Sequence, residues 1–295
     1  MLMVCLLVCY GQPGGATEEE ELYVVGVKAW QDKLYKVAVD QFRQYLDRYP
    51  STVRSDFVWY LFGDSQYQLG ELEGALAAFA HVAEHFPKSE VADEALLKLA
   101  IVQYRLGKYE DSRVTLARLL GVTQDEKLLE QGFYWSAEVS AKEGRCQEAI
   151  AGYEKLLQVF PESALVEDSL YGLGWCHRSL GQAVPAREYF ARLLAEYPES
   201  PFAAQAGVLV AEDRFSQDQY QEAMEMAAQV LARRTSPHVR AEALRLQAES
   251  QYQLGRFEDA ERTCETFLQE FPQHPRRAAI LYLSLIHISE PTRPY

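Results

Sequence analysis

The sequence predicts an all-α protein, a right-handed α-solenoid of about seven stacked helix–turn–helix repeats with a period of 37 residues. Two columns of small residues recur at this period, where we expect the two helices of a repeat to cross closely, and glycine and proline take fixed places around them. A constant period of this length is typical of repeats that bury their apolar faces against their neighbours. The first small column comprises Gly26, Gly63, Ala100, Ala137, Gly174, Ala211 and Ala248. The second, twelve residues further along each repeat, comprises Ala38, Ala75, Ser112, Ala149, Ala186, Ala223 and Ala260.

Each repeat is predicted to contain two helices. In the second repeat, residues 56–69 and 72–86 carry apolar side chains at helical spacing. Gly70 lies between these stretches, where it can adopt the left-handed conformation that ends a helix, and Pro87 stops the second one. The glycine recurs at 107, 144, 181 and 255, whereas Lys33 and Asp218 stand at its place in two repeats. The repeats span residues 19–55, 56–92, 93–129, 130–166, 167–203, 204–240 and 241–277, and with the start of an eighth the solenoid covers 17–282.

The second repeat resembles the tetratricopeptide repeat (TPR) family. Its matching residues are Trp59, Phe62, Gly63, Tyr67, Gly70, Ala75, Phe79 and Pro87. The period departs from the family's usual one of about 34 residues, because three residues are added after the proline. Junctions such as Phe160-Pro161-Glu162-Ser163 are similar to those of bacterial envelope TPR proteins of the BamD and CpoB (YbgF) type. The resemblance implies a non-catalytic scaffold for cell-envelope biogenesis, in outer-membrane assembly or in the coordination of cell division.

Residues 1–16 are predicted to be a signal peptide. Met1 to Tyr10 is almost wholly apolar, and Gly14-Gly15-Ala16 fits the small residues of a cleavage site. We therefore expect a periplasmic protein whose mature chain begins near Thr17, with peripheral association with the outer membrane. Two alternatives stay open: lipidation of Cys9, although Val8 departs from the small residue that this motif prefers, and a start further upstream.

Composition and charge narrow the class of partner. Apolar residues make up 48% and charged residues 24% of the chain, as in globular proteins. The net charge of −14 argues against nucleic acid, which requires a basic surface, and favours a protein or peptide partner with basic residues. After the N-terminus, no run of 18 apolar residues predicts a transmembrane helix.

One motif resembles a metal site, but its context does not favour one. His81-Val82-Ala83-Glu84-His85 matches the H-x-x-E-H signature of some zinc peptidases. The positions equivalent to His81 are polar in the other repeats, which indicates a solvated helix face. Cys146, Cys176 and Cys264 have unrelated spacings, and Cys264 falls in a core column. We expect no catalytic residues, no cofactor and no metal.

The resemblance to TPR domains implies a binding groove lined by the first helix of each repeat. This face is rich in Tyr and Trp, which offer large contact areas, and we expect it to bind an extended peptide or a partner helix. The alternative that some of these tyrosines only pack between helices stays open. The groove residues carried over are Tyr23, Trp30, Tyr60, Asp64, Tyr67, Ile101, Tyr104, Tyr134, Glu138, Tyr171, Trp175, Arg178, Phe215, Glu249 and Tyr252.

The C-terminal residues 283–295 break the repeat pattern. Leu285 stands where a small residue is due, and the string from Leu283 onward looks like one reading frame of a sequencing-library adapter. We expect this tail to be foreign to the native protein, with a divergent capping tail as the alternative. Two further functional interpretations remain: a structural docking subunit of an outer-membrane complex that uses its convex face, and the N-terminal part of a larger enzyme.

Overall fold

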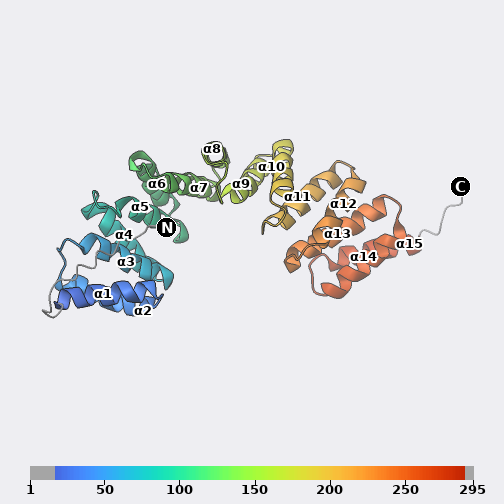
Figure 1. Ribbon diagram of the computed structural model, residues 1–295. Coiled ribbons are helices and arrows are strands. Elements are labelled where there is room, and N and C mark those ends of the chain that lie inside the picture. Colours follow the sequence, from blue (N-terminus) through green and yellow to red (C-terminus); the bar gives the residue numbers. More distant parts are fainter. Residues whose placement is uncertain (1–16, 290–295) are drawn as a thin grey trace. The chain divides into compact units, whose positions relative to one another are not determined.

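The computed structural model describes residues 17–289, with side chains through Ser284, and this part of the chain contains fifteen α-helices and no strand (Figure 1). The helices are α1 (Glu18–Gln31), α2 (Tyr35–Arg48), α3 (Ser55–Gln68), α4 (Leu72–His85), α5 (Ala92–Arg105), α6 (Tyr109–Val122), α7 (Glu126–Lys142), α8 (Cys146–Val159), α9 (Val166–Ser179), α10 (Ala183–Glu196), α11 (Ala203–Ser216), α12 (Tyr220–Leu231), α13 (Pro237–Gln253), α14 (Phe257–Glu270) and α15 (Arg277–Ser289). The chain divides after Gly132, within α7, into an N-terminal block and a C-terminal block. The predicted signal peptide, residues 1–16, lies outside the described residues.

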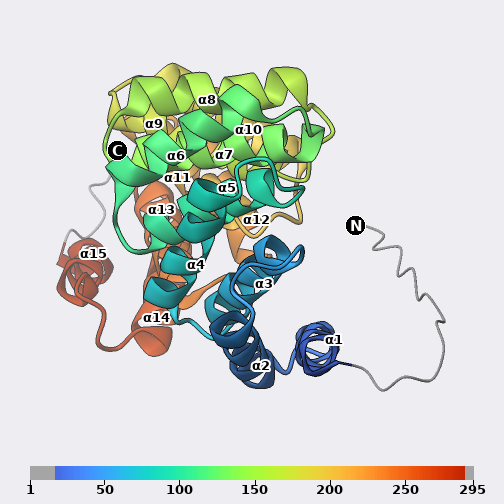
Figure 2. The ribbon, with the colours of Figure 1, turned by 90° about the vertical axis from the view of Figure 1, so that its left-hand side faces the viewer.

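Each repeat consists of a first and a second helix that pack against each other, which confirms the predicted fold class. In the N-terminal block, α1 to α5 each pack against the next helix in the chain, and the first helices α1, α3 and α5 also touch in turn. In the C-terminal block, α8 to α15 pack in the same sequential order, and the first helices α11 and α13 are in contact. The successive pairs can be followed in Figure 1 and, for α1 to α4, in Figure 2.

The turn between the two helices of a repeat has the predicted left-handed residue. Gly70 has a φ of +79°, and the glycines at 107, 144, 181 and 255 have similar values. Lys33 and Asp218, which replace glycine in this column, adopt the same conformation with φ values of 59° and 60°. All these repeats therefore have the same turn geometry, even where Lys or Asp makes the left-handed conformation less favourable than glycine does.

The small columns mark close helix crossings, as predicted. Ala75 and Ala149 are fully buried between the helices of their repeats. A Cβ added to Gly63 would lie 3.0 Å from the Cβ of Ala78, so the two backbones approach too closely for a larger side chain. The crossing in the fifth repeat is tighter, because a Cβ on Gly174 would lie 2.4 Å from Cε1 of Phe190.

A polar pair, buried in the seventh repeat and partly buried in the third, joins the two helices in some repeats and not in others. Thr115 Oγ1 donates to Gln103 Oε1 over 2.8 Å, and Thr263 Oγ1 donates to Gln251 Oε1 over the same distance. In the second repeat, Ala78 takes the place of the threonine. The buried Oε1 of Gln66 accordingly has no hydrogen-bond partner.

We expect Thr263→Val to lower the free energy of unfolding by about 1 to 2 kcal/mol, because it leaves the side-chain oxygen of the buried Gln251 without a donor. Urea-induced unfolding followed by circular dichroism measures the change. The matched control is Thr266→Val, which removes a hydroxyl that donates only to the Arg262 backbone carbonyl on an exposed helix side. Equal effects of the two substitutions would contradict the importance of the Thr–Gln pair.

The C-terminal helix extends beyond the predicted end of the solenoid. Helix α15 continues through residue 283 to Ser289, and Leu283 packs against the core cluster that contains Cys264, Phe267 and Ile280. Leu283 lies three residues after Ile280 and so continues the same apolar helix face. The side chain at position 285 lies outside the described residues, and the foreign origin of the tail stays a prediction.

Candidate binding surface on the first helices

In the N-terminal block, the predicted groove residues meet around a buried carboxylate. Asp64 of α3 is 6% exposed; its Oδ2 accepts from Trp30 Nε1 of α1 over 2.8 Å, and its Oδ1 accepts from Lys98 Nζ of α5 over 3.1 Å. Three first helices are thus joined by one side chain. Because this carboxylate already has two partners, it is not available as an unpaired anion.

Cations cover the rings next to Asp64. The Tyr67 ring lies 5.5 Å from Lys98 Nζ and 4.6 Å from the guanidinium of Arg105, while Arg54 lies 4.5 Å above the Tyr23 ring. Such cation–π contacts hold the rings on the surface of the first helices. Tyr104, half-buried, packs edge-on against Tyr109 at 5.7 Å.

The other two predicted residues of this block are mainly packing residues. Ile101 is buried at 8% exposure. Tyr60 packs against Phe79 with ring centroids 5.8 Å apart, and burial, together with the neighbouring Glu94, raises the pKa of its hydroxyl far above the usual range. The Tyr60 hydroxyl is therefore a neutral hydrogen-bonding group under all physiological conditions.

In the C-terminal block, Trp175 of α9 is the most accessible predicted aromatic residue, at 36% exposure. The Tyr171 ring lies edge-on to it at 6.3 Å and stacks on Phe202 at 4.7 Å, so Tyr171 supports Trp175 from the protein side. Arg178, one turn further along α9, has its guanidinium 5.9 Å from the Trp175 ring. Its Nη2 also donates to Glu212 of α11 over 2.8 Å. Trp175 thus lies on the helix side where neighbouring first helices meet.

The remaining predicted residues of the C-terminal block each contact the second helix of their own repeat or a neighbouring charge. Tyr134 packs against Tyr153, and Glu138 accepts a hydrogen bond from the Tyr153 hydroxyl. Phe215 and Tyr252 pack edge-on against the first residues of α12 and α14. The sequence also predicts that Tyr60, Leu97, Tyr134 and Tyr171, which recur at the repeat period, line up along the first helices. This set involves both blocks, and its alignment stays a prediction.

A buried arginine organises the acidic side chains of α13. Arg245 has 8% side-chain exposure and lies 2.9 Å from Glu242, 2.6 Å from Glu249 and 3.9 Å from Glu212. Burial raises the pKa of Glu249, while the charge of Arg245 opposes the shift. The carboxylates that the sequence placed in the groove are therefore paired within the protein, at Asp64 and Glu138 as well as here.

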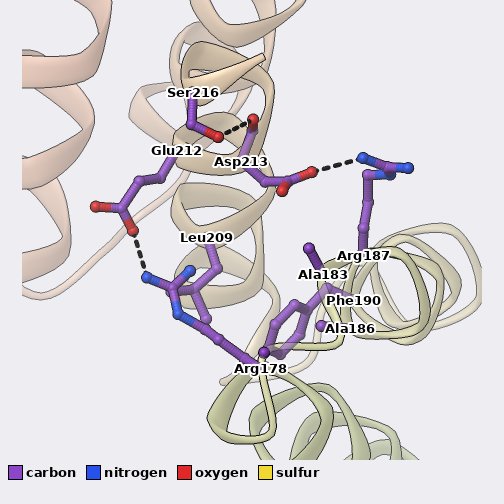
Figure 3. Close-up of a pocket in the computed structure, with 10 residues that line it drawn as sticks. Arg178, Ala183, Ala186, Arg187, Phe190, Leu209, Glu212, Asp213 and Ser216 are labelled. Atoms are coloured by element: carbon purple, nitrogen blue, oxygen red, sulfur yellow. Dashed lines mark hydrogen bonds and ion pairs between the residues drawn. The ribbon is translucent and has the colours of Figure 1, made fainter.

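A pocket of about 260 Å³ opens between the fifth and sixth repeats (Figure 3). Its floor is apolar and includes Ala186, Phe190 and Leu209. Two ion pairs flank it: Arg178 with Glu212 at 2.8 Å and Arg187 with Asp213 at 2.7 Å. Ala183 and Gly181 complete the wall on the side of α10.

His81 and His85 belong to the H-x-x-E-H motif, at which we expect no metal. Their rings stack, with centroids 4.2 Å apart. His81 also packs on Trp59 at 4.3 Å, so it is less solvated than the sequence suggested. Within residues 17–289, no group of three or more potential metal-ligating side chains was found. Burial raises the pKa of the Cys176 thiol to about 12 and that of Cys264 to about 11, so both thiols stay protonated.

The sequence-based prediction missed Lys98 and Arg105, which contact the groove side chains Asp64 and Tyr67, and the ion pair of Arg187 with Asp213 beside the pocket. A signal for part of this set exists. Trp30, Asp64 and Lys98 follow one another at intervals of 34 residues, as do Arg178 and Glu212. This interval is about one helical turn shorter than the repeat period of 37 residues. Two residues at this interval therefore lie on neighbouring first helices, about one turn out of register, and their side chains can meet.

Comparison with known families decides the classification. The YfiO family, described as outer membrane lipoprotein, matches residues 55–214, more than half of the chain. The chain belongs to the YfiO family. A tetratricopeptide repeat family matches residues 214–282, which together with the YfiO match covers most of the predicted solenoid. No curated protein sequence matches the chain significantly. The YfiO description indicates the cell envelope, and among the helices of residues 17–289 none combines the length and hydropathy needed to cross a bilayer.

Solved structures share the fold of this YfiO-family chain. The C-terminal part of a TPR repeat-containing protein from Cytophaga hutchinsonii has a TM-score of 0.70 at 14% identity, covering 88% of this chain and 99% of its own. A TPR protein from Parabacteroides merdae has a TM-score of 0.61 at 16% identity, with 90% and 98% covered. PilF of Pseudomonas aeruginosa has a TM-score of 0.58 at 15% identity, with 77% and 96% covered. At these identities the likeness is one of fold.

Proposed function

We propose that the protein is a non-catalytic TPR scaffold of the bacterial envelope that binds a protein or peptide on the surface of its first helices. It acts on the periplasmic side, with peripheral association with the outer membrane, in outer-membrane assembly or in the coordination of cell division. Membership in a family of outer membrane lipoproteins supports the compartment, and the helical-repeat families that match the chain support a scaffold.

The observation that carries the binding surface is Trp175. Large aromatic side chains left accessible on a preformed surface are typical anchors of protein interfaces, since they lose little conformational freedom on binding. Trp175 is held by Tyr171 from below and flanked by Arg178, so its orientation is set before any partner arrives.

The preference for a basic partner rests on the overall charge. The predicted groove carboxylates Asp64 and Glu249 are paired internally, so the net charge of −14 supplies the attraction. Attraction of this kind acts at long range and is screened by salt. Binding should therefore weaken as ionic strength rises.

A second candidate function, docking through the opposite helices, is favoured by exposed apolar side chains on the second helices. Val114 of α6, Val159 of α8 and Val184 of α10 are 58%, 43% and 54% exposed. Separate exposed valines are ordinary on protein surfaces, whereas a docking face would require them to be buried together by one partner.

We expect Trp175→Ala to weaken capture of the partner from an envelope extract by about tenfold or more, because an anchor of this kind contributes about 2 kcal/mol. The measurement is a quantitative pull-down with tagged protein. Val159→Ala serves as the control on a second helix, and circular dichroism checks that both variants are folded. If Val159→Ala loses the partner and Trp175→Ala keeps it, docking through the second helices replaces the proposed surface.

A further inference from the structure

The pocket between the fifth and sixth repeats occupies the place of a missing pair of rings. In three other repeats, the first residue of the second helix is aromatic and packs edge-on against an aromatic residue in the last turn of the first helix. The pairs are Tyr104 with Tyr109, Phe215 with Tyr220, and Tyr252 with Phe257, with ring centroids 5.7, 5.2 and 5.5 Å apart and interplanar angles of 60°, 64° and 65°.

The fifth repeat has neither ring. Arg178 stands at the position of the first aromatic residue, next to last in α9, and Ala183 stands at that of the second, as the first residue of α10. Both residues line the pocket. Its volume of about 260 Å³ lies below the range of roughly 300 to 1,000 Å³ that is usual for cofactor and drug-sized ligands, so it suits a single side chain.

The lining determines the chemistry of that side chain. The floor offers the ring of Phe190 and the side chain of Leu209, while the charges at the rim are balanced in pairs (Figure 3). A charged guest would have to lose its hydration without gaining an unpaired counter-ion, which disfavours it. The Arg178 guanidinium lies over the pocket edge, with 40% of its side chain exposed, and can cover the face of a ring.

We propose that this pocket accepts a Tyr or Phe side chain from the segment that the partner lays along the first helices. The proposal rests on the proposed function and names the residue type that the surface recognises. The guest ring takes the place that Tyr220 occupies in the next repeat, against Phe190 and Leu209, and Arg178 closes over it. Trp175, one turn away on α9, contacts the adjoining part of the same segment.

The test uses blocked pentapeptides, Ac-Gly-Gly-X-Gly-Gly-NH2, with X as Tyr, Phe, Leu or Ala. Each is titrated to about millimolar concentration into the isotope-labelled full chain, and amide chemical shifts are followed by NMR. The Tyr and Phe peptides should shift the amides of Gly181, Leu209 and Ser216, with affinities at least about fivefold above those of the Leu and Ala peptides. Equal responses to all four peptides, or no response at these amides, would overturn the proposal.

Filling the pocket from within provides the second arm. Ala183→Tyr should abolish the shifts, because its ring would fill the pocket as Tyr220 fills the equivalent place in the sixth repeat. If this variant unfolds, Ala183→Leu replaces it, since Leu72 stands at the equivalent position of the second repeat. The matched control is Ala191→Tyr, on an exposed side of α10 outside the pocket, which should bind as the wild type does. Peptide shifts that persist in folded Ala183→Tyr would refute an aromatic site here.

The two variants distinguish a failure of the pocket proposal from a failure of the proposed function. If Ala183→Tyr captures the envelope partner normally while Trp175→Ala loses it, the pocket proposal fails and the binding surface stands. If neither variant loses the partner, the proposed function fails as well. If sedimentation shows a concentration-dependent dimer that Ala183→Tyr abolishes, the occupant is a second copy of the chain, and the partner-derived ring is ruled out.

Discussion

Replacing Arg245 with methionine is expected to lower the free energy of unfolding of the C-terminal block by about 3 to 5 kcal/mol near neutral pH. The Arg245 side chain is 8% exposed and lies within 3 Å of both Glu242 and Glu249, which are 16% and 28% exposed. Methionine fills a similar volume but leaves Glu249 partly buried without its nearest counter-charge, while Glu242 keeps only the more distant Arg276, at 3.6 Å. The loss therefore arises from uncompensated charge rather than from a cavity.

The penalty should depend on pH in a defined direction. Burial already raises the pKa of Glu249 in the folded protein, and removal of Arg245 removes the charge that opposes this shift. A carboxyl with a raised folded-state pKa binds protons more readily in the folded state, so its contribution to stability falls as the pH rises. The cost of Arg245→Met should thus be full above the folded-state pKa and shrink as the pH falls toward about 4, the unfolded value.

Urea-induced unfolding at several pH values tests both statements. The control is Arg262→Met, which removes an arginine that is 73% exposed and pairs with Asp259 on the surface. An exposed pair of this kind contributes at most about 1 kcal/mol. A penalty for Arg245→Met that matches this control, or that does not change with pH, would show that the buried network is energetically unimportant.

Gly174→Ala is expected to cost about 2 to 3 kcal/mol, since the new methyl group would lie 2.4 Å from Cε1 of the buried Phe190 ring. Repeats with glycine at this position have phenylalanine opposite it: Gly26 with Phe42 and Gly63 with Phe79. In the third repeat, the equivalent positions hold a larger residue, Ala100, and a smaller one, Leu116. The sizes of the two residues compensate each other in these repeats.

The double variant Gly174→Ala/Phe190→Leu copies the third repeat and should lose clearly less stability than the sum of its single changes. Gly121→Ala is the matched control, because a Cβ added there meets nothing within 4 Å. It should be neutral or slightly stabilising, as alanine is the better helix former. Additive effects of Gly174→Ala and Phe190→Leu would contradict the size compensation.

The sequence predicted the features that depend on the period. The left-handed turn at Gly70, the close crossings at Gly63 and Ala75, and the bounds of α3 and α4 all recur at fixed places in each repeat and have local causes. The size compensation between Gly174 and Phe190 also involves positions that recur at the period. It becomes visible only when the residues at these two positions are compared together in each repeat.

The candidate site was less predictable, because it depends on side chains that differ from repeat to repeat. The groove positions were assigned by resemblance, which does not by itself indicate that Asp64 and Glu249 are paired with Lys98 and Arg245. Asp64 and Lys98 stand 34 residues apart, on neighbouring first helices, whereas Arg245 and Glu249 stand four residues apart on α13, so both spacings carry a signal once the helices are known. The pocket is likewise lined by two residues, Arg178 and Ala183, that replace the aromatic pair of three other repeats, and this replacement is recognised only by comparison with those packed pairs.

Site-specific photo-crosslinking in living cells tests most directly the claim that a partner binds on the first helices. A benzophenone amino acid is introduced at Trp175 or Arg178 on α9 and, for comparison, at Val114 or Val159 on the second helices. The account predicts that an envelope protein is crosslinked from positions 175 and 178, and that the yield falls when salt is added to isolated envelopes. Crosslinks that form only from positions 114 and 159 would contradict it and assign binding to the second helices.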